Sequence, residues 1–360
     1  GRNSRSPTFR PSRRSPIAQQ RSAAVTFPGI AARCVRLCAA GRSALALAAA
    51  DMLSRGANPV VRLPFYCCPS VAQPFAEAGF DMRFYSQGAD LSSIPDETPA
   101  SGDVFLFIHW FGFPNRAAVA FVDAFGADRP FAVIEDCVPA SLWAFDRPAS
   151  ASPSHPPDYS AYSFRKVLPV PDGALLASQR LVDAPALPSD RTFVASALAA
   201  LRAMRRDGGR REYLRLSRAA EARLDADASA RDASASGRRI LTRCDIATAA
   251  PRRRENARLL ASLLPSQLRP LHPDVPEDAA PLCLPVLLER GSRDELLRRL
   301  RAAHVVPPLA WDVNPEPGDR FATDRDIARR VIALPVGQEL DGADVERLGE
   351  ILRNAVAGRL

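Results

Sequence analysis

Short apolar stretches alternate with segments of helical periodicity from residue 43 onward. The apolar runs have the length of strands, and the segments between them carry apolar residues three or four positions apart. This alternation predicts βαβ units and a largely parallel sheet in an α/β domain. The expected strands are 59–63, 82–85, 104–109, 131–135, 159–164 and 174–177, and the expected helices are 43–54, 69–78 and 117–125.

The second half of the chain is more helical and less regular. A helical segment at 191–230 is interrupted at Gly208 and Gly209, and the polar segment 234–237 is the best candidate for a domain boundary. Beyond it we expect helices at 252–264, 294–303 and 341–356 and a strand at 282–288. The predicted organisation is an N-terminal arm at 1–36, a large α/β domain at 37–237 and a small C-terminal α+β domain at 238–360.

The positive charge of the chain is concentrated at its N-terminal end. The formal net charge is +8, but residues 1–42 hold nine Arg and no acidic residue, so the other 39 basic residues nearly balance the 40 acidic ones. A stretch rich in Arg, Ser and Pro buries too little apolar surface to fold, so we expect residues 1–36 to be disordered. Weak, salt-sensitive binding of polyanions is the expected property of this arm, and a dedicated nucleic-acid function is the less favoured alternative.

The composition argues against a membrane protein, a secreted protein and a metal-binding protein. With 47% hydrophobic and 24% charged residues the chain is typical of soluble globular proteins, and no apolar run approaches the about 20 residues needed to cross a bilayer. The apolar segment 23–32 is broken by Pro28 and Gly29, which argues against a signal peptide. Seven Cys without paired C-x-x-C spacing indicate unpaired thiols in a reducing cytoplasm, and four scattered His predict no metal site.

The chain contains a single lysine. Of 48 basic residues, 47 are Arg and only Lys166 is Lys. Arg and Lys serve nearly equally on solvated surfaces, but only a Lys amine can lose its proton and condense with a carbonyl. Lys166 is therefore either a chance surface residue or a nucleophile, and its neighbourhood decides between the two.

Three segments place polar groups where ligands bind in parallel sheets. In 40–44, a Gly41 turn leads into an Ala-rich helix, so exposed amides, Arg42 and Ser43 can form an anion site, although simple capping by Ser43 is the common alternative. In 133–137, an apolar strand delivers Asp136 to its tip, where it could pair with a protonated heterocyclic nitrogen or merely cap a helix. In 162–173, Lys166 leaves a strand end before a proline-rich turn. A phosphate cradle, a pyridinium partner and an amine, in that order, are what pyridoxal 5′-phosphate (PLP) requires.

These residues resemble the DegT/DnrJ/StrS-type sugar aminotransferases, which are PLP-dependent enzymes of fold type I. The resemblance covers about residues 38 to 357. Its motifs are the AGRSAL turn at 40–45, the segment 64–79, IHWFG at 108–112, IED at 134–136, SF at 163–164 followed by Lys166, and RRREN, RDEL and ALPV at 252–256, 293–296 and 333–336. Each motif alone is weak, but their order is specific. The fold implied is a large domain with a mostly parallel sheet and a smaller C-terminal α+β domain.

The sequence departs from the family pattern around the cofactor. The loop before Lys166 is two residues shorter than usual. Cys68 occupies the position where the family stacks an aromatic ring on PLP, and Tyr66 is the candidate to replace that ring. Pro139 occupies the position of a residue that contacts the ring oxygen. His109 follows a strand near the site, where a substrate contact and a hydrogen-bonded core imidazole are about equally expected.

The resemblance implies an aminotransferase in which Lys166 bonds to PLP and moves a proton, while Asp136 keeps the ring nitrogen protonated. It further implies that Gly41, Arg42, Ser43 and Ser163 belong to the cofactor site. The implied partners are an amino donor such as glutamate, a nucleotide-linked keto sugar of polysaccharide or secondary-metabolite biosynthesis, and a second copy of the chain in a homodimer. The alternative is a degenerate, non-catalytic scaffold or regulatory protein, favoured by Cys68, Pro139 and the short loop.

Overall fold

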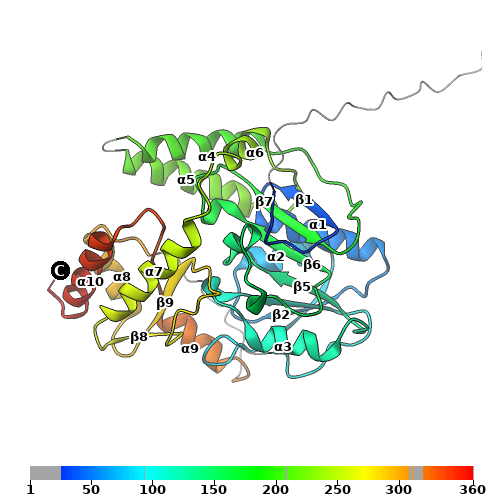
Figure 1. Cartoon of the computed structure of the whole chain (residues 1–360), viewed down its shortest axis with the longest axis horizontal. Coiled ribbons are helices and arrows are strands. Elements are labelled where there is room, and N and C mark those ends of the chain that lie inside the picture. Colours follow the sequence, from blue (N-terminus) through cyan, green and yellow to red (C-terminus); the bar gives the residue numbers. More distant parts are fainter. Residues whose placement is uncertain (1–25, 93, 207–208, 308–310, 312–318, 360) are drawn as a thin grey trace, which may run out of the picture.

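The computed structural model describes residues 26–359 except 93, 207–208, 308–310 and 312–318. Its described strands form a seven-stranded sheet of order β1-β7-β6-β5-β4-β2-β3 and a three-stranded sheet of order β10-β9-β8 (Figure 1). The strands are β1 (Cys34–Cys38), β2 (Val60–Pro64), β3 (Asp81–Tyr85), β4 (Val104–Ile108), β5 (Ala132–Asp136), β6 (Tyr159–Ser163), β7 (Ala174–Ser178), β8 (Leu268–Pro270), β9 (Cys283–Leu288) and β10 (Val331–Pro335).

The large sheet is the mostly parallel α/β sheet that the sequence predicts. Strands β3, β2, β4, β5 and β6 pair in parallel, whereas β7 runs antiparallel to β6 and β1 runs antiparallel to β7. Strands β4, β6 and β7 are buried along their whole length, because helices cover both faces of the sheet. The register pairs Ile108 with Asp136 and Asp136 with Ala161, so the carboxyl ends of β4, β5 and β6 lie together.

Helices surround the two sheets. They are α1 (Gly41–Ser54), α2 (Pro69–Glu77), α3 (Arg116–Phe125), α4 (Arg191–Met204), α5 (Arg210–Asp225), α6 (Ala235–Leu241), α7 (Ala249–Ser262), α8 (Arg293–Ala302), α9 (Ala322–Arg330) and α10 (Gly342–Val356). Helices α4 and α5 form a hairpin at the top of Figure 1. Helix α1 packs against β6 and β7 and lies with its N-terminus near the carboxyl ends of the strands.

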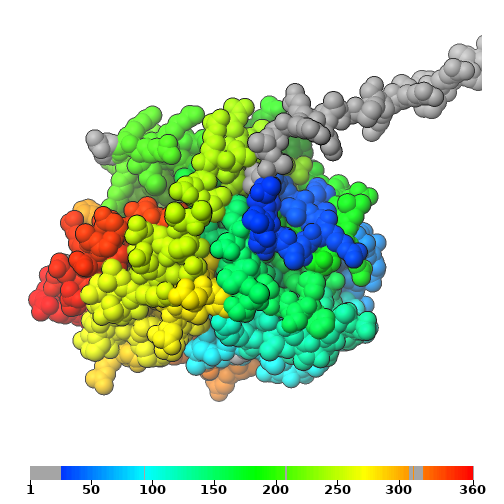
Figure 2. All heavy atoms as spheres, viewed as in Figure 1, coloured from blue at the N-terminus to red at the C-terminus, as the bar shows by residue number. Residues whose placement is uncertain are grey.

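The C-terminal elements form a smaller α+β unit beside the large sheet. Helix α10 buries Val345, Leu348 and Leu352 and packs on α7 and α8. Figure 2 shows this part, yellow to red, packed against the side of the large domain. Among the helices of the described chain, none combines the length and apolar character that crossing a bilayer requires.

Part of the segment 1–36, which the sequence predicts to be disordered, is ordered in the described chain. Residues 26–36 are described and packed, and only residues 1–25 lie outside the described part. Phe27 stacks on Phe164 with ring centroids 5.5 Å apart, the Gly29 N–H donates to the Ala144 carbonyl at 3.2 Å, and β1 pairs with β7. The Arg-rich composition of this segment gives no sign that it is ordered, because its few apolar residues pack against residues far away in the sequence.

The polar segment 234–237, the candidate domain boundary, forms the start of helix α6. Ser234 caps α6, and its Oγ accepts the Gly237 N–H at 2.9 Å. The Ser234 N–H and hydroxyl both donate to the Asp172 carboxylate at 2.7 Å. The segment is thereby fastened to the loop that follows Lys166, and the exact limits of the two domains stay a prediction.

Candidate active site

One pocket collects most of the residues that the sequence singles out. It occupies about 530 Å³, including its opening to solvent, and lies at the ends of β4, β5 and β6 beside the N-termini of α1 and α2. Parallel α/β sheets bind ligands in this position. The lining residues are Ala40, Gly41, Arg42, Leu45, Cys68, Ser70, Val71, Ile108, Asp136, Val138, Pro139, Ser163, Arg165, Lys166 and Trp311.

Lys166 reaches the pocket from a short 3₁₀ turn, Phe164–Lys166, directly after β6. The turn is held by the Phe164 carbonyl, which accepts the N–H groups of Val167 at 3.0 Å and Leu168 at 2.7 Å. Surrounding protein atoms displace water and lower the pKa of the amine, and the negative charge of Asp136 opposes this. The side chain as a whole is exposed, and it lines the pocket.

Asp136 ends β5 and is buried, with 2% of its surface exposed. Its Oδ1 accepts the Val138 N–H at 2.8 Å. Burial raises the pKa of the carboxyl to about 6, while the Val138 hydrogen bond and the charge of Lys166 act in the opposite direction. A cation placed against this carboxylate would remove most of the cost of burying it.

The N-terminus of α1 forms the third wall. The first N–H groups of a helix have no acceptor within it, and Ala40 at the N-cap supplies no side-chain cap. A Cβ on Gly41 would lie 2.9 Å from Val138 Cγ2, so glycine lets the backbone approach the loop after β5. Ser163 lines the pocket opposite this turn and donates its N–H to Ser141 Oγ at 2.7 Å. The turn suits a phosphate group.

The donor set of this pocket fits PLP. A desolvated amine, a buried carboxylate and an uncapped helix N-terminus open into one cavity. These are the three groups that would hold the aldehyde, the ring nitrogen and the phosphate. The fit rests on the side chains present and on the glycine that keeps the turn open.

Comparison with known proteins addresses the fold. No protein-family model matches the sequence, and no curated protein matches it either. Solved structures match along most of the chain. A DegT DnrJ EryC1 StrS aminotransferase from Brucella abortus has a TM-score of 0.59 at 16% identity, over 90% of this chain and 86% of that chain. The chain has the fold of the DegT-type aminotransferases.

Two further structures support the same fold. The sugar aminotransferase CalS13 from Micromonospora echinospora has a TM-score of 0.58 at 18% identity, over 89% of this chain and 87% of that one. Spr1654 from Streptococcus pneumoniae in its PLP form has a TM-score of 0.60 at 12% identity, over 91% and 88%. At these identities the likeness establishes the fold and leaves activity to the site itself.

Within this aminotransferase fold, Arg42 lines the pocket, but its guanidinium is bonded to other residues of the chain. The side chain is buried and donates to the Leu224 carbonyl at 2.5 Å, to Asp225 Oδ1 at 2.7 Å and to Gln73 Oε1 at 3.2 Å. It thus ties α1 to the end of α5, and its expected role in the anion site stays a prediction. Ser43 is buried in α1 and does not line the pocket.

Arg165 is a lining residue that the sequence did not single out. It makes a bidentate ion pair with Glu221 of α5, at 2.5 and 2.9 Å. Its position beside Lys166 was visible in the sequence, but its partner lies 56 residues away.

The aromatic face of the pocket comes from an unexpected residue. Cys68 lines the pocket at the N-cap of α2, with its Sγ 3.0 Å from Ser70 Oγ. Tyr66 is fully buried, stacks on Trp110 with centroids 5.2 Å apart and does not line the pocket. Trp311 does line it, from the segment after α8, and its ring lies 5.8 Å from that of Tyr66. The ring contact expected of Tyr66 is therefore available from Trp311 instead.

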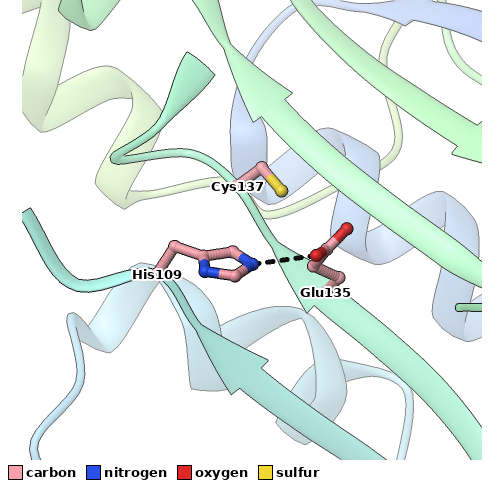
Figure 3. A group of neighbouring side chains, drawn as sticks. All are labelled: His109, Glu135 and Cys137. Carbon is pink, nitrogen blue, oxygen red and sulfur yellow. Dashed lines mark hydrogen bonds and ion pairs between the residues drawn. The ribbon is translucent and has the colours of Figure 1, made fainter. Parts of the chain in front are cut away.

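His109 takes the core arrangement that the sequence left as an alternative to a substrate contact. It is fully buried, its Nδ1 accepts the Asn115 N–H at 3.0 Å, and its Nε2 donates to Glu135 Oε1 at 2.8 Å (Figure 3). Burial lowers the pKa of the imidazole, against the effect of Glu135. With both ring nitrogens engaged and no place in the pocket lining, His109 has no contact to offer a substrate there.

The same cluster brings possible metal ligands together without forming an open metal site. One ligand atom each from His109, Glu135 and Cys137 lies within 4.8 Å of the others. The Glu135 oxygens, however, already accept hydrogen bonds from the Arg147 guanidinium and from Ser160 Oγ. The positive charge next to Glu135 is therefore the guanidinium of Arg147.

Proposed function

We propose that the protein is a PLP-dependent aminotransferase of the DegT type. The observation that carries the proposal is that Lys166 and Asp136, the one amine and the buried acid, line the same pocket as the N-terminus of α1. The fold shared with aminotransferases, one of them in a PLP form, supports it. The proposed reaction moves an amino group from glutamate to a keto sugar carried on a nucleotide, in polysaccharide or secondary-metabolite biosynthesis. The sugar class is suggested by the likeness to CalS13, which is a sugar aminotransferase.

The pocket would hold the cofactor at three points. Lys166 would bond to the aldehyde carbon, Asp136 would face the ring nitrogen, and the amides at Gly41 with Ser163 would bind the phosphate. When bound, PLP supplies an electron sink for charge that develops at the substrate carbon.

The side chains of the chain itself perform the proton work. Desolvation lowers the pKa of Lys166, so a larger share of the amine is neutral and nucleophilic than for a lysine in water. Once released from the cofactor, the same amine could take the proton from the donor carbon and deliver it to a carbon of the cofactor. Asp136 in its ionised form would hold a proton at the ring nitrogen. Trp311 and Ile108 add apolar surface that excludes water from the pocket.

We further propose that the chain acts as a homodimer, since fold-type-I sites are generally completed by a second subunit. Light scattering coupled to size-exclusion chromatography tests this directly. A mass of twice the chain's 38.9 kDa is expected, and a monomer that is fully active would contradict it.

The experiment that tests the function is spectroscopic. Purified protein with PLP should develop a visible absorbance band, and addition of glutamate should replace it by the spectrum of pyridoxamine phosphate. Lys166→Arg keeps the positive charge but cannot form the bond, so it should lack the band while folding normally, as should Lys166→Ala. Absence of a band in the wild-type chain would favour the non-catalytic scaffold.

A further inference from the structure

A buried ion-pair network lies directly beside Asp136. Glu135, the preceding residue on β5, is fully buried and accepts hydrogen bonds from Arg147 at 2.6 and 2.8 Å, one at each carboxylate oxygen. Ser160 Oγ adds a bond of 2.9 Å and His109 Nε2 one of 2.8 Å. Figure 3 shows His109 and Glu135 meeting from two adjacent strands. Every lone-pair direction of this carboxylate is accounted for.

Arg147 is itself held in place. Its side chain is 7% exposed, donates to the Ala151 carbonyl at 2.6 Å and lies over the Trp143 ring, 4.9 Å from the centroid. Burial alone would raise the pKa of Glu135, but the charge and hydrogen bonds of Arg147 hold it well below its ordinary range. Glu135 is therefore ionised, and the guanidinium of Arg147 beside it offsets part of its charge.

This compensation matters because two adjacent acids share one strand end. Successive side chains on a strand point to opposite faces, so Asp136 faces the pocket while Glu135 faces the network. Two uncompensated carboxylates so close in a poorly hydrated interior cannot both stay ionised. The negative charge of Glu135 already acts against ionisation of Asp136.

We propose that Arg147 is a positioning residue that acts through Glu135: by offsetting that charge it keeps Asp136 ionised at neutral pH, ready for a cationic ring nitrogen. The inference rests on the proposed function. The network would then serve cofactor binding and not a metal ion, since the guanidinium already bonds to both Glu135 oxygens.

The groups that face Asp136 come from three elements. They are Lys166 on the turn after β6, Glu135 and Cys137 on either side of Asp136 in sequence, Cys67 before α2, and the Val138 N–H. Burial raises the pKa of both thiols, so Cys67 and Cys137 stay neutral in the range of interest. Lys166 and the Glu135 pair are the charges that set the ionisation of Asp136.

The test measures PLP binding as a function of pH, by equilibrium dialysis, in four proteins. Binding requires ionised Asp136 and is lost as the pH falls through its pKa. Arg147→Gln leaves Glu135 uncompensated, so the pH at half-maximal binding should rise by about one unit. Glu135→Gln leaves Arg147 uncompensated, so the midpoint should fall by a similar amount. The double variant restores the balance and should return the midpoint close to that of the wild type.

A purely structural role of the network cannot shift the binding midpoint in opposite directions in the two single variants. If the network only supports the fold, both single variants should weaken binding at every pH and shift the midpoint in the same direction. That result, or a double variant no nearer to wild type than either single one, would overturn the inference. If Arg147→Gln fails to fold, two results still test the inference. They are the lower binding midpoint of Glu135→Gln and the return of the double variant's midpoint to the wild-type pH. Protonation of His109 in Arg147→Gln would reduce the upward shift without changing its sign.

Arg129 provides a matched control. It is also a buried arginine, paired with Asp158 at 2.8 Å, but Asp158 precedes β6 and therefore lies at the opposite end of the sheet from Asp136. Arg129→Gln should lower stability without moving the binding midpoint. If the wild-type chain binds no PLP at any pH, the proposed function fails first, and this inference falls with it.

Discussion

Replacing Asp136 by Asn should stabilise the empty protein while weakening the cofactor site. Asn has the same shape, and its side-chain oxygen can still accept the Val138 N–H that now donates to Oδ1 at 2.8 Å. What the variant loses is a buried negative charge. Burial raises the pKa of this carboxyl from 3.8 to about 6, and two units of pKa correspond to about 3 kcal/mol.

The sign of the effect follows from linkage. The folded protein binds this proton more tightly than the unfolded chain, so Asp136 costs little below pH 4 and destabilises progressively until the pH exceeds about 6. Asp136→Asn should therefore exceed the wild type by only about 0.5 kcal/mol at pH 4 and by up to about 3 kcal/mol at pH 7.5. Loss of the negative charge near Lys166 reduces this gain, because the amine then has less compensation.

Urea denaturation of both proteins without PLP, at pH 4 and 7.5, measures the difference. PLP affinity at pH 7.5, measured in parallel, should fall at least tenfold in the variant. An Asp136→Asn protein that is less stable than wild type at pH 7.5, or a difference that does not grow with pH, would refute the reasoning.

Three further outcomes are expected. Gly41→Ala should weaken PLP binding because its Cβ would meet Val138 Cγ2 at 2.9 Å, and Val138→Ala in the same chain should restore part of the loss, as titration with PLP would show. Acrylamide should quench Trp311 far more than Trp110 or Trp143, which are about 2% and 1% exposed, and PLP should protect that fraction; equal quenching with and without PLP would place Trp311 outside the site. The rate at which the protein bonds to PLP should rise with pH and level off below the ordinary lysine pKa of 10.5, because the neutral amine reacts; a rate still rising above that value would contradict the desolvation of Lys166.

Much of the large domain was predictable because its signals are local. The apolar runs of β4 and β5 and the Ala-rich α1 carry their periodicity within a few residues, and parallel strands bring their carboxyl ends to one edge of the sheet. The expectation that Lys166 and Asp136 lie near each other needs little more than that rule. The single lysine in a chain of arginines made the amine conspicuous.

Elements that depend on distant partners were not predictable. Strand β1 is five residues in an Arg-rich stretch, and it becomes a strand through pairing with β7, some 140 residues later. The composition of segment 234–237 is typical of a polar link. In the structure Ser234 caps helix α6, and Asp172 accepts its hydrogen bonds. Local composition does not contain these contacts.

The candidate site shows the same division. Arg42 resembled a phosphate ligand in its local turn, but its acceptors lie on α2 and α5, up to 183 residues away. Trp311 lines the pocket from the C-terminal part of the chain, and no sequence motif marks it as a site residue. The network of Arg147 and Glu135 is likewise tertiary, since only the fold reveals which of the two adjacent acids faces the pocket.

The central claim is that Lys166 is the residue that bonds to PLP. Reduction of the PLP-treated protein with borohydride, followed by proteolysis and mass spectrometry, tests it most directly. We predict one phosphopyridoxyl group on the peptide that contains Lys166, and none when Lys166 is replaced by Arg. An unmodified Lys166, or label confined to the terminal amine, would contradict the account.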